Sequence, residues 1–234
     1  MNQNIAVIIP TYKETKNIPL LLDNIFGVLP KITVIFVDDS PQQYANELKL
    51  LIESRKEKII VLSRLKKLGR GSAVIAGFKE ALKNKKIKYI FEMDADLAHD
   101  PKEFTRFLQA IHAADLVIGS RYRTRSTIIK WPMRRLILSK IINRFLSTLL
   151  GLNLTDYTNG FRLYNRKAVE YITSVRVNST GFIVLSEIAY KLKKAGFIIK
   201  EVPISFTDRK YGKSNADIKE HLSSLLEVFR IRFF

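Results

Sequence analysis

Short, unbroken runs of apolar residues alternate along the chain with longer segments in which apolar residues recur every three or four positions. An unbroken run is typical of a parallel strand covered on both faces, and the wider spacing is typical of a helix with one buried face. The runs predict strands at 5–9, 32–37, 59–62, 89–91 and 116–118. The spacing predicts helices at 18–25 and near 43–56, 71–84 and 101–113. This alternation indicates an α/β fold of the Rossmann-like, nucleotide-binding type, with a mostly parallel central sheet.

A polar cluster follows each predicted strand. The clusters are Pro10-Thr11-Tyr12-Lys13-Glu14, Asp38-Asp39-Ser40-Pro41, Lys67-Leu68-Gly69-Arg70-Gly71, Asp94-Ala95-Asp96 and Gly119-Ser120-Arg121-Tyr122. Open α/β sheets bind ligands at the carboxyl edge of their strands, so we expect the clusters to form one site.

Asp94 and Asp96 are the most informative residues of these clusters. Residues two apart on an extended strand share a face, and two hard oxygen donors on one face can hold Mg²⁺ or Mn²⁺ against a diphosphate. The chemistry suggested is transfer from a nucleotide sugar. An isolated Asp-x-Asp triplet is also common in solvated turns, so its companions decide the interpretation.

Composition is compatible with a single catalytic domain. The chain has 234 residues, of which 47% are hydrophobic, enough to bury one sizeable core. Cysteine is absent, so neither disulfides nor thiolate metal sites contribute. We expect no signal peptide, because Met1 to Tyr12 lacks a basic leader, and no membrane span, because no uncharged stretch approaches ~20 residues.

Charge is distributed unevenly along the chain, whose formal net charge is +18. The segment from Leu116 to Thr155 has no Asp or Glu and carries Arg121, Arg123, Arg125, Lys130, Arg134, Arg135, Lys140 and Arg144. Apolar residues, among them Trp131 and Phe145, lie between these basic residues. Such a segment suits an anionic membrane surface, although a core-packed helix with a solvated basic face gives the same pattern.

In their order and spacing, the strand-end clusters resemble those of the GT-A family 2 glycosyltransferases. Two later segments narrow the resemblance. Asn159-Gly160-Phe161-Arg162-Leu163-Tyr164 is similar to that family's Ser-Gly-Phe-Arg-Leu-Tyr motif, and the stretch from Glu201 to Ser214 is similar to one in dolichyl-phosphate mannose synthases. The resemblance implies a GT-A fold over residues 1–215, with amphipathic helices near the acceptor site and a membrane-proximal amphipathic helix at 216–234.

The resemblance also implies which residues contact the donor. The residues expected to hold the nucleotide sugar are Pro10, Tyr12, Glu14, Val37, Asp39, Asp94, Ala95, Asp96, Arg121, Arg209 and Lys213. Aromatic rings pack against the base, and carboxylates accept hydrogen bonds from base N–H groups or ribose hydroxyls. Asp96 is expected to ligate Mg²⁺ or Mn²⁺ directly, with Asp94 at the ribose or in the metal's water shell. Asp39 has an alternative role as a turn or helix-capping residue.

The implied acceptor is a polyprenyl or dolichyl phosphate, whose anionic oxygen is itself the nucleophile. Catalysis then requires two repelling anions to be held together, a task that suits guanidinium groups. The expected catalytic residues are Asp96, Arg121, Arg135 and Ser139, with Arg134 as an alternative to its neighbour. Arg209 is expected to close over the donor diphosphate.

Two other residues have more than one interpretation. Glu187 could contact the sugar or organise Arg162, or it could form a helix-face ion pair with Lys191. His99 follows the metal-site strand, where a lone histidine is most often a surface or capping residue.

The resemblance favours mannosyl transfer from GDP-mannose to the lipid phosphate, giving GDP, and several other functions compete with this one. A polyprenyl-phosphate glucosyl- or N-acetylhexosaminyltransferase using a UDP-sugar shares most of the motifs. A basic nucleic-acid-binding domain would explain the charge but not the carboxylates, and no zinc-finger or RRM signature is present, so we expect no nucleic-acid partner. A dinucleotide oxidoreductase lacks its Gly-x-Gly-x-x-Gly, and a processive polysaccharide synthase lacks its Gln-x-x-Arg-Trp.

The expected location is peripheral, on the cytoplasmic face of a membrane, where a lipid phosphate can be reached. Relatives differ in whether membrane helices follow the terminal amphipathic segment. A membrane-anchoring subunit or a C-terminal membrane region is therefore a possible partner.

Overall fold

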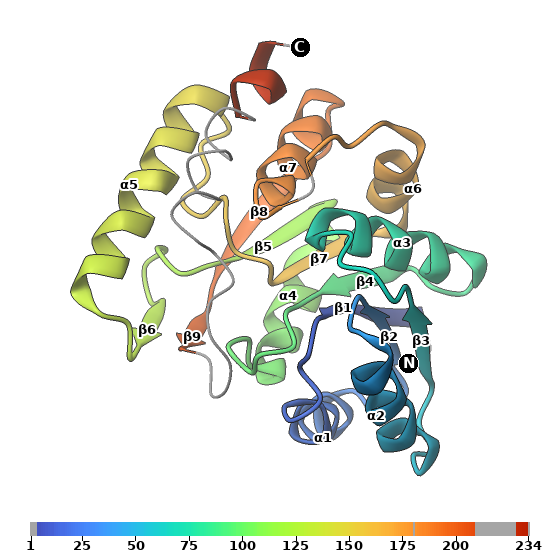
Figure 1. Cartoon of the computed structure of the whole chain (residues 1–234). Helices are drawn as coiled ribbons and strands as arrows, with labels where there is room; N and C mark the ends of the chain where they lie inside the picture. Colours follow the sequence, from blue (N-terminus) through green and yellow to red (C-terminus); the bar gives the residue numbers. More distant parts are fainter. Residues whose placement is uncertain (1–3, 180, 209–227, 234) are drawn as a thin grey trace.

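The computed structural model describes residues 4–179, 181–208 and 228–233 (Figure 1). The strands are β1 (Ile5–Thr11), β2 (Thr33–Asp38), β3 (Ile59–Ser63), β4 (Tyr89–Glu92), β5 (Leu116–Ser120), β6 (Thr127–Ile129), β7 (Arg162–Asn165), β8 (Ile199–Pro203) and β9 (Ser205–Thr207). The α-helices are α1 (Ile18–Val28), α2 (Gln42–Glu53), α3 (Arg70–Lys83), α4 (Phe104–Ala110), α5 (Met133–Leu150), α6 (Arg166–Ser174) and α7 (Val184–Lys194). Short 3₁₀ turns, Pro101–Glu103 and Ile111–Ala113, flank α4.

Seven strands form the central sheet in the order β3-β2-β1-β4-β7-β5-β8. Only β7 runs antiparallel to its neighbours, β4 and β5, so the sheet is mostly parallel, as predicted. The chain moves from β1 outward to β2 and β3, then crosses to β4 on the other side of β1. This reversal of strand order creates a crevice at the carboxyl ends of β1 and β4, where doubly wound sheets bind ligands.

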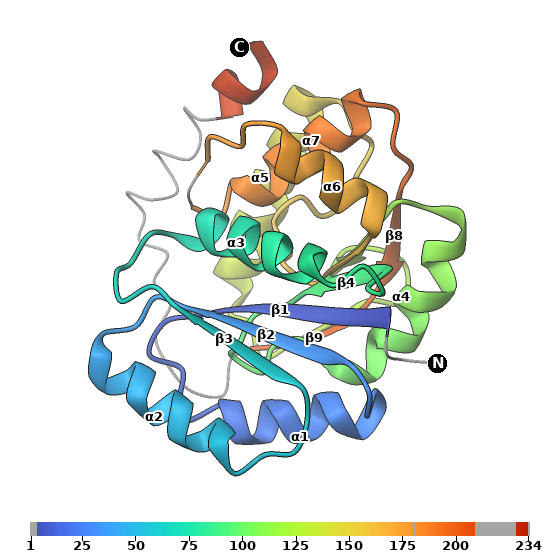
Figure 2. The same ribbon diagram turned by 90° about the vertical axis from the view of Figure 1, so that its right-hand side faces the viewer.

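Helices cover both faces of the sheet (Figure 2). Along β1, Ala6 and Ile8 point into a core made with α3, α6 and α7, whereas Val7 and Ile9 point into a second core made with α1 and α4. Both faces of the strand are therefore buried, which explains why its sequence is apolar without alternation.

The five predicted strands are confirmed, each extended by one or two residues at its end or shifted by one. The helix predicted near 101–113 is divided into a 3₁₀ turn, α4 and a second 3₁₀ turn. The strands β6, β7, β8 and β9 were not predicted. The helical segment 228–233 lies within the expected terminal helix, whose remaining residues and whose boundary at 215–216 fall outside the described part of the chain.

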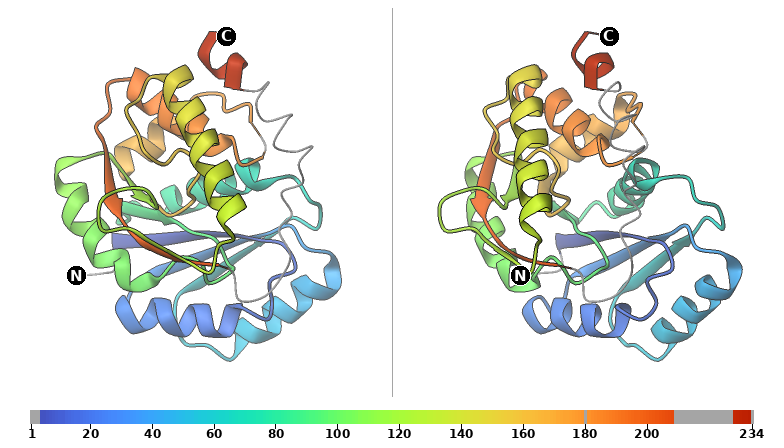
Figure 3. Two further views of the ribbon diagram at one scale, coloured as in Figure 1. Left: turned by 90° about the vertical axis from the view of Figure 1, so that its left-hand side faces the viewer. Right: turned by 60° about the vertical axis from the view of Figure 1, so that its left-hand side comes forward.

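α5 lies along the outside of the molecule (Figure 3). Near its start, the small parallel ladder of β6 and β9 connects two distant parts of the chain. Near its end, the ring of Phe145 is 6.4 Å from that of Phe229 in the terminal segment. Within the described residues, no helix combines the length and apolar character needed to cross a membrane.

Candidate active site

A cavity of about 260 Å³ opens at the carboxyl ends of β1, β2 and β4. It is lined by Pro10, Thr11, Tyr12, Glu14, Asp39, Lys67, Gly69, Arg70, Ala73, Asp94, Ala95, Asp96, Gly181 and Phe182. The structure thus brings together seven of the residues predicted to bind a nucleotide sugar. The polar clusters of the sequence therefore lie in the crevice that the strand order creates.

Asp94 is held by an arginine that sequence analysis assigned no role. Arg70, in the first turn of α3, places Nη2 3.0 Å from Asp94 Oδ1 and Nη1 2.5 Å from Glu92 Oε1. Burial alone would lower the pKa of Arg70, but the charges of Glu92 and Asp94 outweigh it and the pKa is raised. Arg70 is therefore a fixed cation at the start of α3 that pairs with the carboxylates at the end of β4.

Gly160, two residues before β7, lies where a side chain has no room. A Cβ at this position would overlap the guanidinium of Arg70 and lie 3.2 Å from Asp94 Oδ1. Only a glycine lets the chain pass this close to the ion pair. The signal was present in the Asn159–Tyr164 motif, but the motif alone does not reveal which residue its glycine accommodates.

His99 is buried, with 1% of its surface exposed, so its interpretation as a surface residue is wrong. Its Nδ1 accepts a hydrogen bond from the backbone N–H of Asp94 at 3.1 Å, and its Nε2 lies 2.9 Å from Asn159 Oδ1. Accepting at Nδ1 places the ring proton on Nε2, which donates to the amide oxygen. The imidazole also stacks on Phe161. His99 therefore positions the backbone that carries the carboxylate pair.

Asp96 lies at the turn that follows β4. Its Oδ1 accepts a hydrogen bond from the backbone N–H of Ala98 at 3.1 Å, and Leu97 between them has a φ of 65°. This turn directs the carboxylate to the cavity that it shares with Asp94.

Asp39 lines the cavity, and it also forms an ion pair that neither its expected nucleotide contact nor its capping role had predicted. Both its oxygens bind Arg64, at 2.6 and 2.8 Å, and Oδ2 also accepts from the backbone N–H of Leu68 at 2.9 Å. It does not cap α2, whose N-cap residue is Pro41. Val37 is fully buried in the core and is not among the residues that line the cavity, so its expected contact with the nucleotide sugar stays a prediction.

Tyr12 and Glu14 form the wall contributed by the loop after β1. The ring of Tyr12 has the ammonium groups of Lys13 and Lys67 at 5.2 and 5.1 Å from its centroid. Glu14 Oε2 accepts a hydrogen bond from Asn17 Nδ2 at 2.6 Å. An aromatic face beside two cations suits a nucleobase that carries a diphosphate.

A second cluster lies at the start of α5. Arg135 and Ser139 are one helical turn apart and share a face. The Tyr122 hydroxyl donates to Ser139 Oγ at 2.5 Å, and Arg135 Nη1 pairs with Asp208 Oδ1 at 2.8 Å. The guanidinium of Arg135 stacks 4.1 Å from the ring centroid of Trp131 and keeps 38% of its side-chain surface exposed. The predicted acceptor residues are thus adjacent and partly accessible.

Arg121 is held by partners within the protein, and its expected contact with the substrates stays a prediction. Its Nε and Nη2 bind the two oxygens of Asp156 at 2.7 and 2.8 Å, and Nη2 also donates to Thr158 at 2.7 Å. Only 8% of its side chain is exposed. Burial alone would lower the pKa of Arg121, but Asp156, with a smaller contribution from Asp94, raises it. The other two predicted basic contacts, Arg209 and Lys213, lie outside the described residues.

Asp94 and Asp96 suit a divalent cation whose coordination shell is completed by oxygen atoms of the substrate. Among residues 4–179, 181–208 and 228–233, no group of three or more His, Cys, Asp or Glu side chains forms a metal cage. Mg²⁺ in nucleotide sites is commonly held by one or two carboxylates together with phosphate oxygens and water, and Asp94 and Asp96 line one cavity in that manner.

The sheet, its crevice and this cavity define a nucleotide-dependent group-transfer enzyme. Residues 6–173 match glycosyl transferase family 2, and the chain belongs to that family. The polyprenol monophosphomannose synthase of Mycolicibacterium smegmatis is 38% identical over 96% of this chain and 86% of its own. The undecaprenyl-phosphate mannosyltransferase of Micrococcus luteus is 34% identical over 90% of this chain and 86% of its own.

Solved structures establish the fold. The glucosyl-3-phosphoglycerate synthase of Mycobacterium tuberculosis, in complex with Mn²⁺ and uridine-diphosphate-glucose, superposes with a TM-score of 0.65 at 18% identity, covering 97% of this chain and 77% of that one. The chain has the GT-A fold that the sequence predicted.

Proposed function

We propose that this protein is an inverting mannosyltransferase that moves mannose from GDP-mannose to a polyprenyl phosphate such as dolichyl phosphate. The observation that carries the proposal is the pairing of two sites. A carboxylate-bearing nucleotide cavity lies at the sheet edge, and an arginine–serine–tyrosine cluster lies at the start of α5. Two relatives with 34–38% identity are mannosyl transferases to polyprenyl carriers by name.

The donor is held by the walls of the cavity. Tyr12 packs against the base and Glu14 accepts from the ribose or base, while Asp96 and Asp94 would hold Mg²⁺ or Mn²⁺ beside the diphosphate. Such a cation neutralises the leaving diphosphate as a Lewis acid. Arg70 keeps the Asp94 carboxylate oriented, and His99 keeps its backbone in place.

The acceptor phosphate is placed by Arg135, Ser139 and Tyr122. One anionic oxygen attacks the anomeric carbon of mannose, the new carbon–oxygen bond forms as the bond to the diphosphate breaks, and GDP departs. The attacking oxygen carries no proton at neutral pH, so no general base is required. The cluster contributes by bringing two anions into contact distance, which is a matter of positioning and electrostatics.

The test is a panel of radiolabelled nucleotide sugars with a short polyprenyl phosphate, with and without Mn²⁺. The proposal expects mannolipid from GDP-mannose only. Transfer from a UDP-hexose or UDP-N-acetylhexosamine instead would assign the protein to the alternative donor class.

Arg135→Ala is expected to reduce transfer to polyprenyl phosphate on the order of 10²-fold, the scale of losing one charge-stabilising donor. Affinity for GDP-mannose should stay within about twofold, because Arg135 does not line the donor cavity. Steady-state kinetics and calorimetry measure the two effects. Arg134→Ala is the matched control, since it removes the same charge one residue away. A larger loss for Arg134→Ala, or loss of donor binding by Arg135→Ala, would reverse the assignment.

We also propose that α5 and the terminal segment dock on the cytoplasmic face of an anionic membrane. Exposed apolar side chains on these two elements are Met133, Ile137, Leu138, Ile141, Phe145, Phe229 and Phe233. Lys130, Arg134, Lys140 and Arg144 are exposed along the same stretch. Apolar side chains flanked by cations suit the interface between headgroups and acyl chains. A membrane-anchoring subunit or further membrane region would strengthen this attachment.

Flotation with liposomes is expected to show binding to anionic vesicles and little binding to neutral ones. Each basic residue near such a surface contributes about 1 kcal/mol, and the attraction weakens as salt shortens the Debye length. Ile137→Ser combined with Ile141→Ser should lower binding without changing charge. Equal binding to both kinds of vesicle would contradict the proposed surface, and tight binding to duplex DNA without transferase activity would favour the nucleic-acid alternative.

A further inference from the structure

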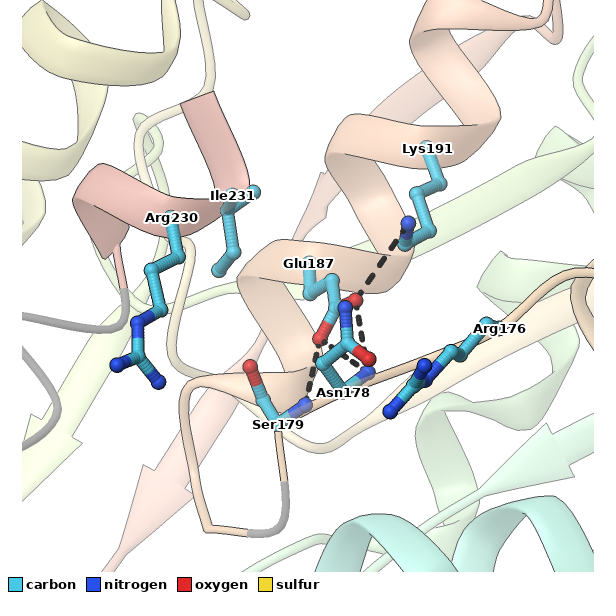
Figure 4. Close-up of a pocket in the computed structure, with 7 residues that line it drawn as sticks. All are labelled: Arg176, Asn178, Ser179, Glu187, Lys191, Arg230 and Ile231. Atoms are coloured by element: carbon cyan, nitrogen blue, oxygen red, sulfur yellow. Dashed lines mark hydrogen bonds and ion pairs between the residues drawn. The ribbon is translucent and has the colours of Figure 1, made fainter. Parts of the chain in front are cut away.

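A second cavity, of about 610 Å³, lies beside α7 (Figure 4). It is lined by Arg176, Asn178, Ser179, Glu187, Lys191, Arg230 and Ile231. Glu187 is the unusual member of this set, because a carboxylate in the first turn of a helix is only 1% exposed. A buried carboxylate needs partners, so its contacts show what it does.

The partners of Glu187 are backbone amides of the segment that precedes α7. Asn178 N–H donates to Oε1 and Oε2 at 3.0 and 3.2 Å, and Ser179 N–H donates to Oε2 at 2.8 Å. Lys191, one turn further along α7, brings Nζ to 3.6 Å from Oε1, which confirms the helix-face ion pair. Arg162 donates instead to the backbone oxygen of Leu185, so Glu187 does not organise it.

The same segment is held from its other side by α3. A Cβ at Gly71 would lie 2.5 Å from the backbone oxygen of Ser179, so only glycine allows this approach. Gly69 and Arg70, immediately before it, line the donor cavity. Just beyond Ser179 in the sequence, Gly181 and Phe182 line that cavity too. The backbone of Ser179 therefore contacts Glu187 through its N–H and packs against Gly71 through its oxygen, next to one wall of the donor site.

We propose that Glu187 is a positioning residue for the donor site, acting through the backbone of Asn178 and Ser179 to set the wall made by Gly181 and Phe182. This inference rests on the proposed function for the identity of the donor. Glu187 does not itself line the donor cavity, and the anionic acceptor needs no general base. Glu187 therefore positions the backbone of Asn178 and Ser179 and takes no part in the reaction. A carboxylate suits the task because it only accepts, whereas a glutamine would turn a donor group toward one of the amides.

The experiment measures binding of GDP-mannose and UDP-glucose with Mn²⁺ by calorimetry for Glu187→Gln, Phe182→Ala and the double variant. Glu187→Gln is expected to weaken binding of the preferred donor on the order of 10-fold, the scale of a lost charge-assisted hydrogen bond. KM for polyprenyl phosphate should not change. The two substitutions should be non-additive, because both act on the same wall. Glu170→Gln, the same chemical change at an exposed helix pair, is the matched control.

A merely structural role predicts a different pattern. Glu187→Gln would then lower the melting temperature while the folded fraction kept wild-type donor affinity, or its effect would add to that of Phe182→Ala, and either result overturns the inference. If the wild type binds a donor but makes no mannolipid, the proposed function fails while the binding comparison still decides the role of Glu187. If it binds neither donor, the donor-site assignment and this inference fall together.

Discussion

Asp96→Ala is expected to abolish detectable transfer, a loss of about 10³-fold or more, while the protein remains folded. The substitution removes a carboxylate from the clamp on the diphosphate, and loss of such charge stabilisation costs several kcal/mol in the transition state. The side chain is partly exposed and lies at a turn, where it accepts a hydrogen bond from the backbone N–H of Ala98, so its removal is expected to leave the core intact. Product formation from GDP-mannose, measured with a thermal melt, separates the two effects.

Asp100→Asn is the matched control for this loss. Asp100 is an exposed carboxylate four residues along the same segment, where its side chain caps a 3₁₀ turn by accepting from the backbone N–H of Lys102. Asparagine caps equally well, so activity and melting temperature should be those of the wild type. If Asp96→Ala turned over at the wild-type rate in the presence of chelator, the carboxylate pair would have no role in metal-assisted transfer.

The strands β1, β2, β4 and β5 could be predicted because they are almost entirely buried and their sequences are unbroken apolar runs. Ile5–Thr11 and Thr33–Asp38 need apolar residues on both faces, and an unbroken run reports that directly. β7 could not be predicted in the same way. It has four residues and begins with Arg162, whose guanidinium is satisfied inside the protein by backbone oxygens of Tyr157, Asn159 and Leu185.

The candidate site was predictable where strand ends converge and not where distant residues pair. Asp94, Asp96 and Tyr12 follow strands, so the topology of an α/β sheet brings them together. His99 depends on Asn159, which lies 60 positions away and has no local signature. Motif position assigned Arg121 to the substrate, but no local signal reveals that it also pairs with Asp156, 35 residues later. Local sequence reports burial and strand ends, whereas side-chain partners depend on the complete fold.

Asp156→Ala is expected to destabilise the protein by about 3–5 kcal/mol, because it leaves the guanidinium of Arg121 buried without its counter-ion. Asp156 is fully buried and accepts hydrogen bonds from Nε and Nη2 of Arg121 and from the backbone N–H groups of Arg121 and Asn159. For a chain of this length, such a loss lowers the melting temperature by roughly 10 °C or more. Urea denaturation gives the free energy of unfolding directly.

Arg121→Met combined with Asp156→Leu decides between a structural pair and a substrate ligand. If the two residues serve each other, the double variant should be less destabilised than the sum of the single variants, with a coupling of roughly 1–3 kcal/mol. The aromatic neighbours of the guanidinium, Trp131 and Phe206, offer an apolar surface for the methionine to pack against. Additive losses in stability, together with a selective loss of donor or acceptor affinity in Arg121→Met at temperatures where it is folded, would restore Arg121 to the substrate-binding set.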